Sequence, residues 1–488
     1  MADSIVEIIR DNAVKDPDRL CIVDADGEKT YAEVWNEARQ KAQALSEAGV
    51  SRTDCVMVEC SQKADYIISL FACNLIGAVF VAIENKAAQL RVTDIEKETD
   101  AKLFVHVSEY RTDCRQLCYK DLEARSGASE DIRLPRGEET AEILYTTGTT
   151  GKSKGIEITH ANNIALAENI CDGTKMKEGN VELIPLPISH SHGIRCCYAN
   201  FFKSGTVILT DGVTRVKDIY NYIRDYRATA MDLSPAAASV LLRLTRGKLS
   251  AFGEQLDYIQ IGTAALSEEL KSELRSLFPE VRLYNFYGST ESGRSCALNF
   301  NSEEDRKYCI GRPTKNAKFI VTDEERHEIA SSKERTGLLA CAGAMNMKGY
   351  WKQPELTAKT MRDGYIFTND EGYIDQDGFV YVLGRHDDII NYKGIKIAPE
   401  EIEEVVRKYV HVKDCACVPV ADPVSGQVPK LFISVDNEDL FDKKEFADYL
   451  EKHIDGNKMP KKIQIIESIP RAMNGKIQRN KLMGGNVS

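Results

Sequence analysis

Residues Tyr145-Thr-Thr-Gly-Thr-Thr-Gly-Lys-Ser-Lys-Gly155 form a polar stretch between two short apolar runs, Ile143-Leu144 and Ile156-Glu-Ile158. The apolar runs are typical of strands, so the sequence predicts a loop between two strands. Glycines let backbone N–H groups line a concavity, and the hydroxyls add donors to phosphate oxygens. Each lysine contributes about 4 kcal/mol against a phosphate at about 4 Å if the effective dielectric is near 20. The stretch therefore predicts a polyphosphate-binding loop.

Two other interpretations apply to this loop. A Walker A motif requires glycine five positions before Gly151, where Thr146 stands, and a helix directly afterwards, where β-like residues follow. The kinase or GTPase class is therefore disfavoured. Taken alone, the stretch also fits a plain Gly/Thr-rich hairpin turn, so the remainder of the chain has to decide.

Length and composition limit the function. A chain of 488 residues with 43% hydrophobic and 28% charged residues predicts two or more domains. Its net charge of −11 argues against a nucleic-acid or anionic-membrane surface. The 14 cysteines have no C-x₂-C spacing, and Met1-Ala-Asp-Ser is no apolar leader, which predicts a cytoplasmic protein with reduced thiols. The apolar run 67–83 is shorter than the roughly 20 residues of a membrane span and predicts a buried helix and strand.

The chain alternates helix and strand patterns up to about residue 290, which predicts a mostly parallel sheet covered by helices. Short alternating runs over 310–381 predict a β-rich subdomain, and the last hundred or so residues predict a small α/β domain. We expect an α/β protein with an N-terminal domain at 1–384 and a C-terminal domain at 385–488. Polar turns are expected at 27–31, 187–193, 285–291 and 368–373. Because ligands gather at the carboxyl ends of strands, the second and third of these turns are expected to share a cleft.

Five motifs in order resemble the adenylate-forming superfamily of acyl-CoA synthetases, aryl-CoA ligases, luciferases and peptide-synthetase adenylation domains. They are the loop 146–155, Tyr287-Gly-Ser-Thr-Glu291, the segment around Asp370, Gly384-Arg-His-Asp-Asp388 with Tyr392-Lys-Gly394, and Pro470-Arg-Ala-Met-Asn-Gly-Lys476. The resemblance covers nearly the whole chain. It implies that a carboxylate attacks Mg·ATP to give acyl-AMP and pyrophosphate, after which a thiol takes the acyl group. It also implies a C-terminal domain that swings about a hinge at Asp387.

The resemblance assigns catalytic roles to residues whose chemistry suits them. Lys476 is a cation that reaches the carboxylate and α-phosphate, although a lysine in a basic tail is on its own more often solvated. Glu291 is an oxygen ligand of the kind Mg²⁺ prefers, and Thr290 donates to the α-phosphate. The ATP-binding residues implied are Thr146, Thr147, Gly148, Thr149, Thr150, Gly151, Lys152, Asn285, Tyr287, Thr290, Asp370, Arg385 and Lys476.

The acyl site implied by the resemblance comprises His190, Arg195, Thr263, Ala264, Gly288 and Ser289. His190 borders the carboxylate, unless it is a structural histidine at a strand end. A zinc site with His192 is disfavoured, because the sequence shows no evident third ligand nearby. No acidic residue follows the turn at 187–193, which disfavours an amino acid substrate. Gly288 stands where acetate-specific relatives carry tryptophan, which predicts an open acyl tunnel.

Two further features concern substrate and geometry. Arg195, or less favourably Arg294, could meet the second carboxylate of a dicarboxylic acid, while a structural arginine is the more common case. Asn369 stands where the family usually has glycine, so the backbone before Asp370 is expected to differ slightly.

The sequence predicts an acid–thiol ligase, an acyl- or aryl-CoA synthetase that uses ATP and Mg²⁺ and takes coenzyme A as co-substrate. Lys393 and Gly394 lie where a pantetheine arm would pass, but a carrier protein offers the same thiol. A stand-alone adenylation enzyme that loads a diffusible carrier protein is thus the alternative within this chemistry. A non-catalytic sensor of ATP or an acyl ligand is the alternative from another class, against which Glu291 and Lys476 argue.

Overall fold

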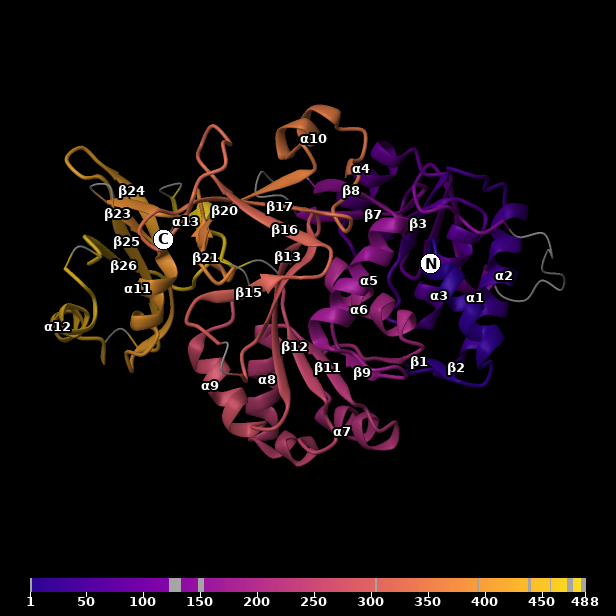
Figure 1. Cartoon of the computed structure of the whole chain (residues 1–488), viewed down its shortest axis with the longest axis horizontal. Helices are drawn as coiled ribbons and strands as arrows, with labels where there is room; N and C mark the ends of the chain where they lie inside the picture. The colour runs from indigo at the N-terminus through magenta and orange to yellow at the C-terminus, as the bar shows by residue number, and fades with distance from the viewer. Residues whose placement is uncertain are drawn as a thin grey trace. The chain divides into compact units, whose positions relative to one another are not determined.

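The computed structural model describes residues 2–122, 133–147, 153–302, 305–392, 395–437, 440–456, 458–471 and 477–483 (Figure 1). The chain divides into two compact units. The first comprises Met1–Phe319 and Cys341–Ile366, and the second comprises Ile320–Ala340 and Phe367–Ser488.

One sheet of the first unit carries the candidate site. Its strands from β13 to β1 in the order below are parallel, whereas β14 and β15 next to β13, and β2 next to β1, run antiparallel to their neighbours. The strand order is β15 (Cys309–Pro313), β14 (Gly293–Asn299), β13 (Arg282–Ser289), β12 (Tyr258–Ile261), β11 (Ala230–Leu233), β9 (Val181–Ile184), β10 (Thr206–Leu209), β1 (Leu20–Asp24) and β2 (Gly27–Thr30).

The second sheet of this unit ends in a hairpin. Strands β6, β5, β3, β4 and β7 lie side by side in this order, and each is parallel to its neighbours. Strand β7 then forms an antiparallel hairpin with β8, and β8 pairs with the short strand β18. The order is β18 (Gly349–Tyr350), β8 (Ser153–Thr159), β7 (Thr140–Thr147), β4 (Val79–Ile83), β3 (Cys55–Glu59), β5 (Leu103–His106) and β6 (Arg115–Cys118).

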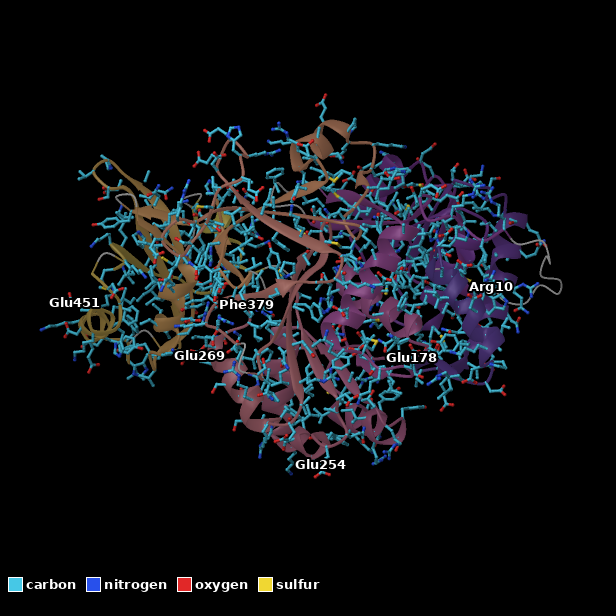
Figure 2. The ribbon with its side chains drawn as sticks, in the orientation of Figure 1. Arg10, Glu178, Glu254, Glu269, Phe379 and Glu451 are labelled. Atoms are coloured by element: carbon cyan, nitrogen blue, oxygen red, sulfur yellow. The ribbon has the colours of Figure 1, made fainter. Side chains whose placement is uncertain are left out.

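Helices join the two sheets through one continuous core. This core contains Ile22 and Val207 of the first sheet, Val56 and Phe80 of the second, and side chains of several helices between them. In contrast, charged side chains such as Glu178 and Glu254 point outward (Figure 2). The helices of the unit are α1 (Ile5–Lys15), α2 (Tyr31–Glu47), α3 (Ala64–Leu75), α4 (Gln89–Thr99), η1 (Tyr119–Leu122), α5 (His160–Thr174), α6 (Ser191–Phe202), α7 (Val216–Asp225), α8 (Pro235–Thr245), η2 (Lys248–Phe252), α9 (Glu268–Leu277) and α10 (Pro354–Thr360).

The second unit holds a smaller α/β sheet with its own core, which includes Ile390, Ile402 and Leu431. Its order is β23 (Ile395–Ile397), β22 (Ile390–Tyr392), β25 (Gly426–Val435) and β24 (Val412–Asp422), with β26 (Lys462–Ile465) parallel to β25. The helices are α11 (Pro399–Val406), α12 (Lys443–His453) and α13 (Arg479–Met483). In the chain, β19 (Met361–Arg362), β20 (Tyr365–Ile374) and β21 (Val380–Arg385) come before this sheet. The chain passes from the first unit to the second within β16 (Ala317–Thr322) and returns to the first within β17 (Gly337–Gly343).

The predicted α/β class with helix-covered, mostly parallel sheets is confirmed, and so are the buried helix and strand of 67–83, now α3 and β4. Among the described helices, none combines the length and the apolar character that a bilayer span requires. None of the 14 cysteines, all of which are described, forms a disulfide bond. The domain boundary after residue 384 stays a prediction.

Four predicted turns are wrong in part, because polar residues continue regular elements where a partner pairs with them. Residues 27–30 form β2 against β1, and 285–289 extend β13 against β14. Residues 368–373 lie within β20, opposite β21. Helix α6 already begins at Ser191, inside the predicted turn. Strand β11 was not predicted, because the buried Asp232 interrupts its apolar run.

Candidate active site

The predicted phosphate loop connects β7 and β8 directly. Tyr145 pairs with Gly155, Thr146 with Lys154, and Thr147 with Ser153, so both strands extend further into the motif than the apolar runs predicted. Gly148, Thr149, Thr150, Gly151 and Lys152, and the side chain of Thr147, lie outside the described residues. The hairpin nevertheless fixes where the two ends of the motif lie.

Tyr350 brings the end of this hairpin to Glu291. Strand β18 pairs with β8 in the register Tyr350 to Ile156, and Lys154 Nζ lies 5.6 Å from the centre of the Tyr350 ring. The Tyr350 hydroxyl donates to Glu291 Oε1 over 2.9 Å, and Met347 N donates to Glu291 O over 2.8 Å. Two predicted motifs, far apart in sequence, thus meet through a tyrosine that sequence reasoning missed.

Helix α6 approaches the same segment from another direction. Ser191 Oγ lies 3.0 Å from Thr290 Oγ1. Arg195 donates through Nη2 to Thr290 O over 2.9 Å and through Nη1 to Ser289 O over 3.3 Å. The side chain of His190, at the start of the helix, is 51% exposed, with Nε2 3.7 Å from Glu84 Oε1. Partial burial lowers the pKa of His190, although Glu84 acts in the opposite direction.

The other predicted residues of this unit surround the carboxyl ends of β12 and β13. Asn285 is largely buried, Tyr287 has its ring 6.2 Å from that of Phe319, and Gly288 is exposed. Thr263 and Ala264 directly follow β12, which pairs in parallel with β13. The predicted acyl residues and the nucleotide residues 285–290 therefore cluster at one end of the first sheet, whereas Thr146 and Thr147 lie on β7 of the second sheet.

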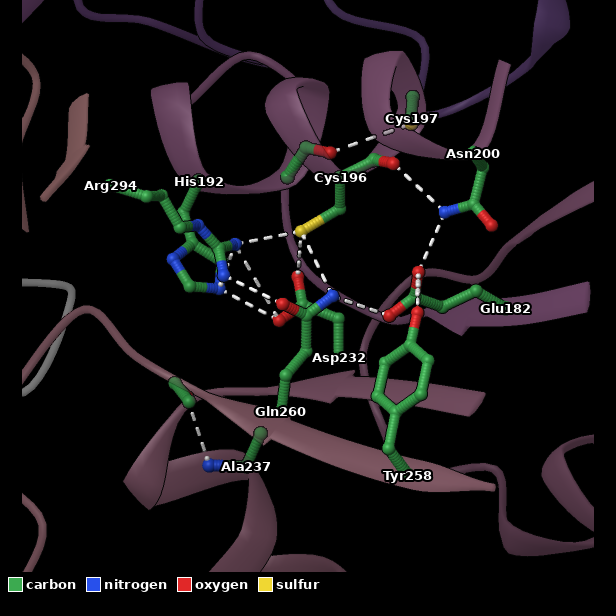
Figure 3. Close-up of polar contacts among 12 residues, drawn as sticks. Glu182, His192, Cys196, Cys197, Asn200, Asp232, Ala237, Tyr258, Gln260 and Arg294 are labelled. Carbon is green, nitrogen blue, oxygen red and sulfur yellow. Dashed lines mark hydrogen bonds and ion pairs between the residues drawn. The ribbon is translucent and has the colours of Figure 1, made fainter. Parts of the chain in front are cut away.

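A buried polar network lies beneath this end of the sheet (Figure 3). His192 Nε2 is 2.8 Å from Asp232 Oδ1, and the Cys196 thiol donates to Asp232 Oδ2 over 2.9 Å. Arg294 donates to Gln260 Oε1 over 2.7 Å. Gln260 in turn donates to Glu182, whose pKa burial raises to about 7. Sequence reasoning missed this network, because its members come from α6 and four different strands.

The network brings two other possible metal ligands to His192, whereas His190 is not part of it. His192, Cys196 and Asp232 place their ligand atoms within 4.8 Å of one another. Arg294 Nη2, however, lies 2.7 Å from Cys196 Sγ and 3.0 Å from His192 Nε2. A guanidinium cation among the three ligand atoms opposes a metal cation there by charge repulsion. The geometry thus favours a hydrogen-bonded network over a zinc site.

Both arginines considered for a dicarboxylic substrate are buried and engaged. Arg195 is 2% exposed and Arg294 is 4% exposed. Arg195 bonds to backbone carbonyl groups, and Arg294 bonds to the network. Neither side chain therefore presents a free guanidinium to a ligand in this structure.

In the second unit, Asp370 pairs with Arg385 across β20 and β21, and Arg385 Nη1 lies 3.4 Å from Asp370 Oδ1. Asn369 has a φ of 60°, the left-handed conformation that glycine adopts readily. Its Nδ2 donates to Asp387 Oδ2 over 2.9 Å. Lys393, Gly394 and Lys476 lie outside the described residues.

Two family models match the chain. The AMP-binding enzyme model matches residues 9–351, and the AMP-binding enzyme C-terminal domain model matches residues 401–476. The chain belongs to the AMP-binding enzyme family. This confirms the predicted membership of the adenylate-forming group.

This AMP-binding enzyme also resembles individual proteins over its full length. It is 24% identical to 4-coumarate–CoA ligase 2 of Nicotiana tabacum, covering 95% of this chain and 91% of the relative. It is 26% identical to peroxisomal OPC-8:0-CoA ligase 1 of Arabidopsis thaliana, covering 95% and 90%. Among solved structures, ATP-bound MatB from Rhodopseudomonas palustris has a TM-score of 0.90 at 23% identity, covering 99% and 98%. The o-succinylbenzoate CoA synthetase MenE of Bacillus subtilis, in complex with its acyl-adenylate, has a TM-score of 0.87 at 22% identity, covering 99% and 98%. The fold of the AMP-binding enzyme is thereby established.

The residues around Glu291 fit a magnesium ion. Mg²⁺ is commonly held by one or two carboxylates together with substrate phosphates and water. Glu291 offers a carboxylate, the preceding Thr290 has its hydroxyl next to that of Ser191, and Lys154 lies over the ring of Tyr350. This oxygen-rich donor set suits a hard cation that arrives with a polyphosphate.

Proposed function

We propose that this AMP-binding enzyme is an ATP-dependent acyl-CoA ligase. A carboxylate oxygen of the acid attacks the α-phosphorus of ATP, and the bond to pyrophosphate breaks to leave acyl-AMP. The sulfur of coenzyme A then attacks the acyl carbon, and AMP departs. The observation that carries the proposal is that Glu291, at the end of the first sheet, meets helix α6 through Thr290 and the β7–β8 hairpin of the second sheet through Tyr350.

Positioning and charge stabilisation supply most of the catalysis of phosphoryl and nucleotidyl transfer, because the protein has little covalent work to do. Thr290 would donate to the α-phosphate, and the loop 146–152 would hold the outer phosphates. Mg²⁺, held by Glu291, would neutralise charge on the phosphates. Tyr287 and Asn285 would contact adenine, and His190 with Thr263, Ala264, Gly288 and Ser289 would surround the acyl group.

The family's motifs also assign roles to residues of the second unit. Asp370 would accept from the ribose hydroxyls beside Arg385, and Lys476 would bring a cation to the reacting carboxylate. Residues 385–488 would form the mobile domain, with Asp387 as its hinge and Lys393 and Gly394 along the pantetheine path. These roles rest on the family's motifs and on the chemistry of each side chain.

The relatives support coenzyme A as the acceptor, because three of the four compared are named as CoA ligases or synthetases. Their names include aromatic acids such as 4-coumarate and o-succinylbenzoate, so aromatic acids enter the substrate panel first. A diffusible carrier protein remains the alternative acceptor. A cytoplasmic location and the absence of nucleic-acid partners remain predictions from the cysteine pattern and net charge.

ATP–pyrophosphate exchange tests the proposal. Wild type and Lys476→Ala are assayed with aromatic, fatty, dicarboxylic and amino acids, and coenzyme A is then added to any active mixture. Lys481→Ala is the matched control, since it removes a nearby lysine outside the proposed site. Adenylation is supported if Lys476→Ala reduces the exchange rate by about 10²–10³-fold and Lys481→Ala leaves it unchanged.

The acceptor and the alternatives are read from the same assay. Thioester formation with coenzyme A supports the ligase, and exchange without thioester indicates a carrier protein. If ATP binds but no acid gives exchange, the enzyme assignment fails in favour of an ATP sensor.

A further inference from the structure

Helix α6 carries two polar side chains on the face toward β13. Ser191 and Arg195 are four positions apart and thus lie on the same side of the helix, one turn from each other. Both contact the Ser289–Thr290 segment. His192, Cys196 and Asn200 form the other polar stripe of the helix, which belongs to the buried network (Figure 3).

Arg195 lies in an apolar part of the helix. Its neighbours Ile194, Cys196 and Cys197 are 0–1% exposed, and Arg195 itself is 2% exposed. A buried charge is costly unless hydrogen bonds compensate for its lost hydration. Burial lowers the pKa of Arg195 to about 10, which keeps the guanidinium charged at neutral pH.

Two backbone carbonyl groups accept hydrogen bonds from Arg195, and the nearby Glu142 also favours the charged form, because it raises the pKa of Arg195. Nη2 and Nη1 donate to Thr290 O and Ser289 O, respectively, at the end of β13. Among the described residues, no carboxylate forms an ion pair with Arg195, and Nε has no hydrogen-bond partner. A buried donor without a partner costs stability, so packing alone does not explain why an arginine occupies this position.

The two carbonyls belong to the residues directly before Glu291. Fixing them sets the direction of the following peptide, and with it the Thr290 hydroxyl and the Glu291 carboxylate. Ser191 contacts the Thr290 hydroxyl from the same helix face, while Tyr350 holds Glu291 from the opposite strand. The planar fork of arginine suits two adjacent acceptors, which the point charge of lysine matches only in part.

We propose that Arg195 is a positioning residue that clamps the Ser289 and Thr290 carbonyl groups and so aligns Thr290 and Glu291 for Mg·ATP. This inference rests on the proposed function and gives Arg195 a role other than binding a second substrate carboxylate. It also makes α6, whose first turn borders the acyl site, the helix that aligns the nucleotide site.

The test compares Arg195→Met, Arg195→Lys and Ser191→Ala with the control Cys197→Ala, which removes a buried side chain from the same helix without touching the clamp. ATP–pyrophosphate exchange is measured against Mg²⁺, ATP and acid concentration. We expect Arg195→Met to lower kcat by up to ~10²-fold and to raise the Mg²⁺ concentration for half-maximal rate about tenfold, with the KM for the acid within about twofold. Arg195→Lys should recover part of both losses, and Ser191→Ala should change the same parameters less.

Several outcomes would overturn the proposal. Arg195 would be merely structural if Arg195→Lys and Ser191→Ala changed thermal stability as Cys197→Ala does and left the Mg²⁺ dependence untouched. A selective loss of dicarboxylic over monocarboxylic acids would instead make Arg195 a substrate ligand. If wild type gives no exchange, the proposed function fails on its own, and calorimetry of ATP binding with and without Mg²⁺ still tests the clamp. Arg195→Met or Arg195→Lys should then reduce the gain in ATP affinity that Mg²⁺ provides. If both variants keep this gain, Arg195 does not align the magnesium site.

Discussion

The hydroxyl of Tyr350 donates to Glu291 Oε1 over 2.9 Å, and the face of the same ring lies 5.6 Å from Lys154 Nζ. One tyrosine thus stands between a lysine of the phosphate-loop motif and the proposed metal ligand. Its position is fixed by β18, which pairs with β8 directly after the loop. The hydrogen bond holds Oε1 of the Glu291 carboxylate in place. Because the carboxylate is planar and rigid, this also orients its second oxygen.

Tyr350→Phe should weaken the response to Mg²⁺. A hydrogen bond to a charged group contributes about 1.5–3 kcal/mol, so its loss predicts at least about a tenfold rise in the Mg²⁺ concentration for half-maximal exchange. The variant keeps the ring that lies under Lys154. Magnesium titration of ATP–pyrophosphate exchange measures the effect.

Tyr66→Phe is the matched control for this prediction. Tyr66 is 1% exposed, and its hydroxyl has no hydrogen-bond partner among the described residues. Removing that hydroxyl should leave both activity and thermal stability unchanged or slightly improved. Equal behaviour of the two variants would refute the role of the Tyr350 hydroxyl.

Gly288→Ala should destabilise the β13–β14 hairpin. A Cβ at this position would lie 1.7 Å from Gly293 O and 2.8 Å from Gly293 C, so the backbone itself has to move. We expect a loss of about 1–3 kcal/mol of stability together with reduced exchange. Gly456→Ala is the control, because an added Cβ there meets nothing within 4 Å. Thermal midpoints that fall equally in both variants would contradict the argument.

The same geometry bears on the predicted open acyl tunnel. A bulky residue at 288 collides with the backbone of Gly293 before it reaches any tunnel. A Gly288→Trp variant would therefore report on hairpin damage rather than on acyl-chain length. The open tunnel stays a prediction, to be tested with acids of different length.

Sequence patterns predicted the fold where periodicity was local. The alternation of helix and strand patterns predicted the helix-covered, mostly parallel sheets, and the apolar run 67–83 predicted the buried helix and strand that are α3 and β4. Boundaries were wrong where a polar stretch forms one strand of a hairpin, as at Asn285–Ser289, which pairs with the following strand β14. Polar residues give no apolar alternation that would mark such a strand.

The candidate site shows a second limit of prediction from sequence, which concerns contacts between distant positions. Motifs pointed to Glu291 and Thr290, but their contacts with Tyr350 and Arg195 join positions far apart in the chain. Strand β11 was not predicted, because it contains Asp232. A buried acid is compatible with a strand only when partners such as His192 surround it. These relationships depend on packing between elements, which a single sequence does not encode locally.

His160 should make the protein less stable in acid. Burial lowers its pKa to about 4, although Glu139 acts in the opposite direction, whereas an unfolded histidine titrates near 6.5. Between these two values the unfolded chain binds more protons, so stability is full above about pH 6.5 and falls as the pH drops toward 4. At pH 5 the loss from this group is roughly 2 kcal/mol.

Chemical unfolding of wild type and His160→Gln at pH 8 and pH 5 measures this contribution. The difference in unfolding free energy between the two pH values should be smaller in the variant by roughly 2 kcal/mol. Parallel pH dependences would show that His160 does not contribute. If the variant is less stable by the same amount at both pH values, the loss reflects packing. The test therefore depends on the difference between the two pH values.

Asn369 and Asp370 allow the backbone and the side chain to be tested separately. Asn369 has a φ of 60°, so Asn369→Ala should cost about 1–2 kcal/mol of stability and disturb the adjacent Asp370, whereas glycine adopts this conformation without steric cost. We therefore expect Asn369→Ala to raise the KM for ATP and Asn369→Gly to preserve it, although both lose the hydrogen bond to Asp387. Asp363→Ala is the matched control, because Asp363 has a φ of 51° in an exposed turn outside the proposed site. An equal rise in KM for both Asn369 variants would assign the effect to the Asp387 contact instead of the backbone.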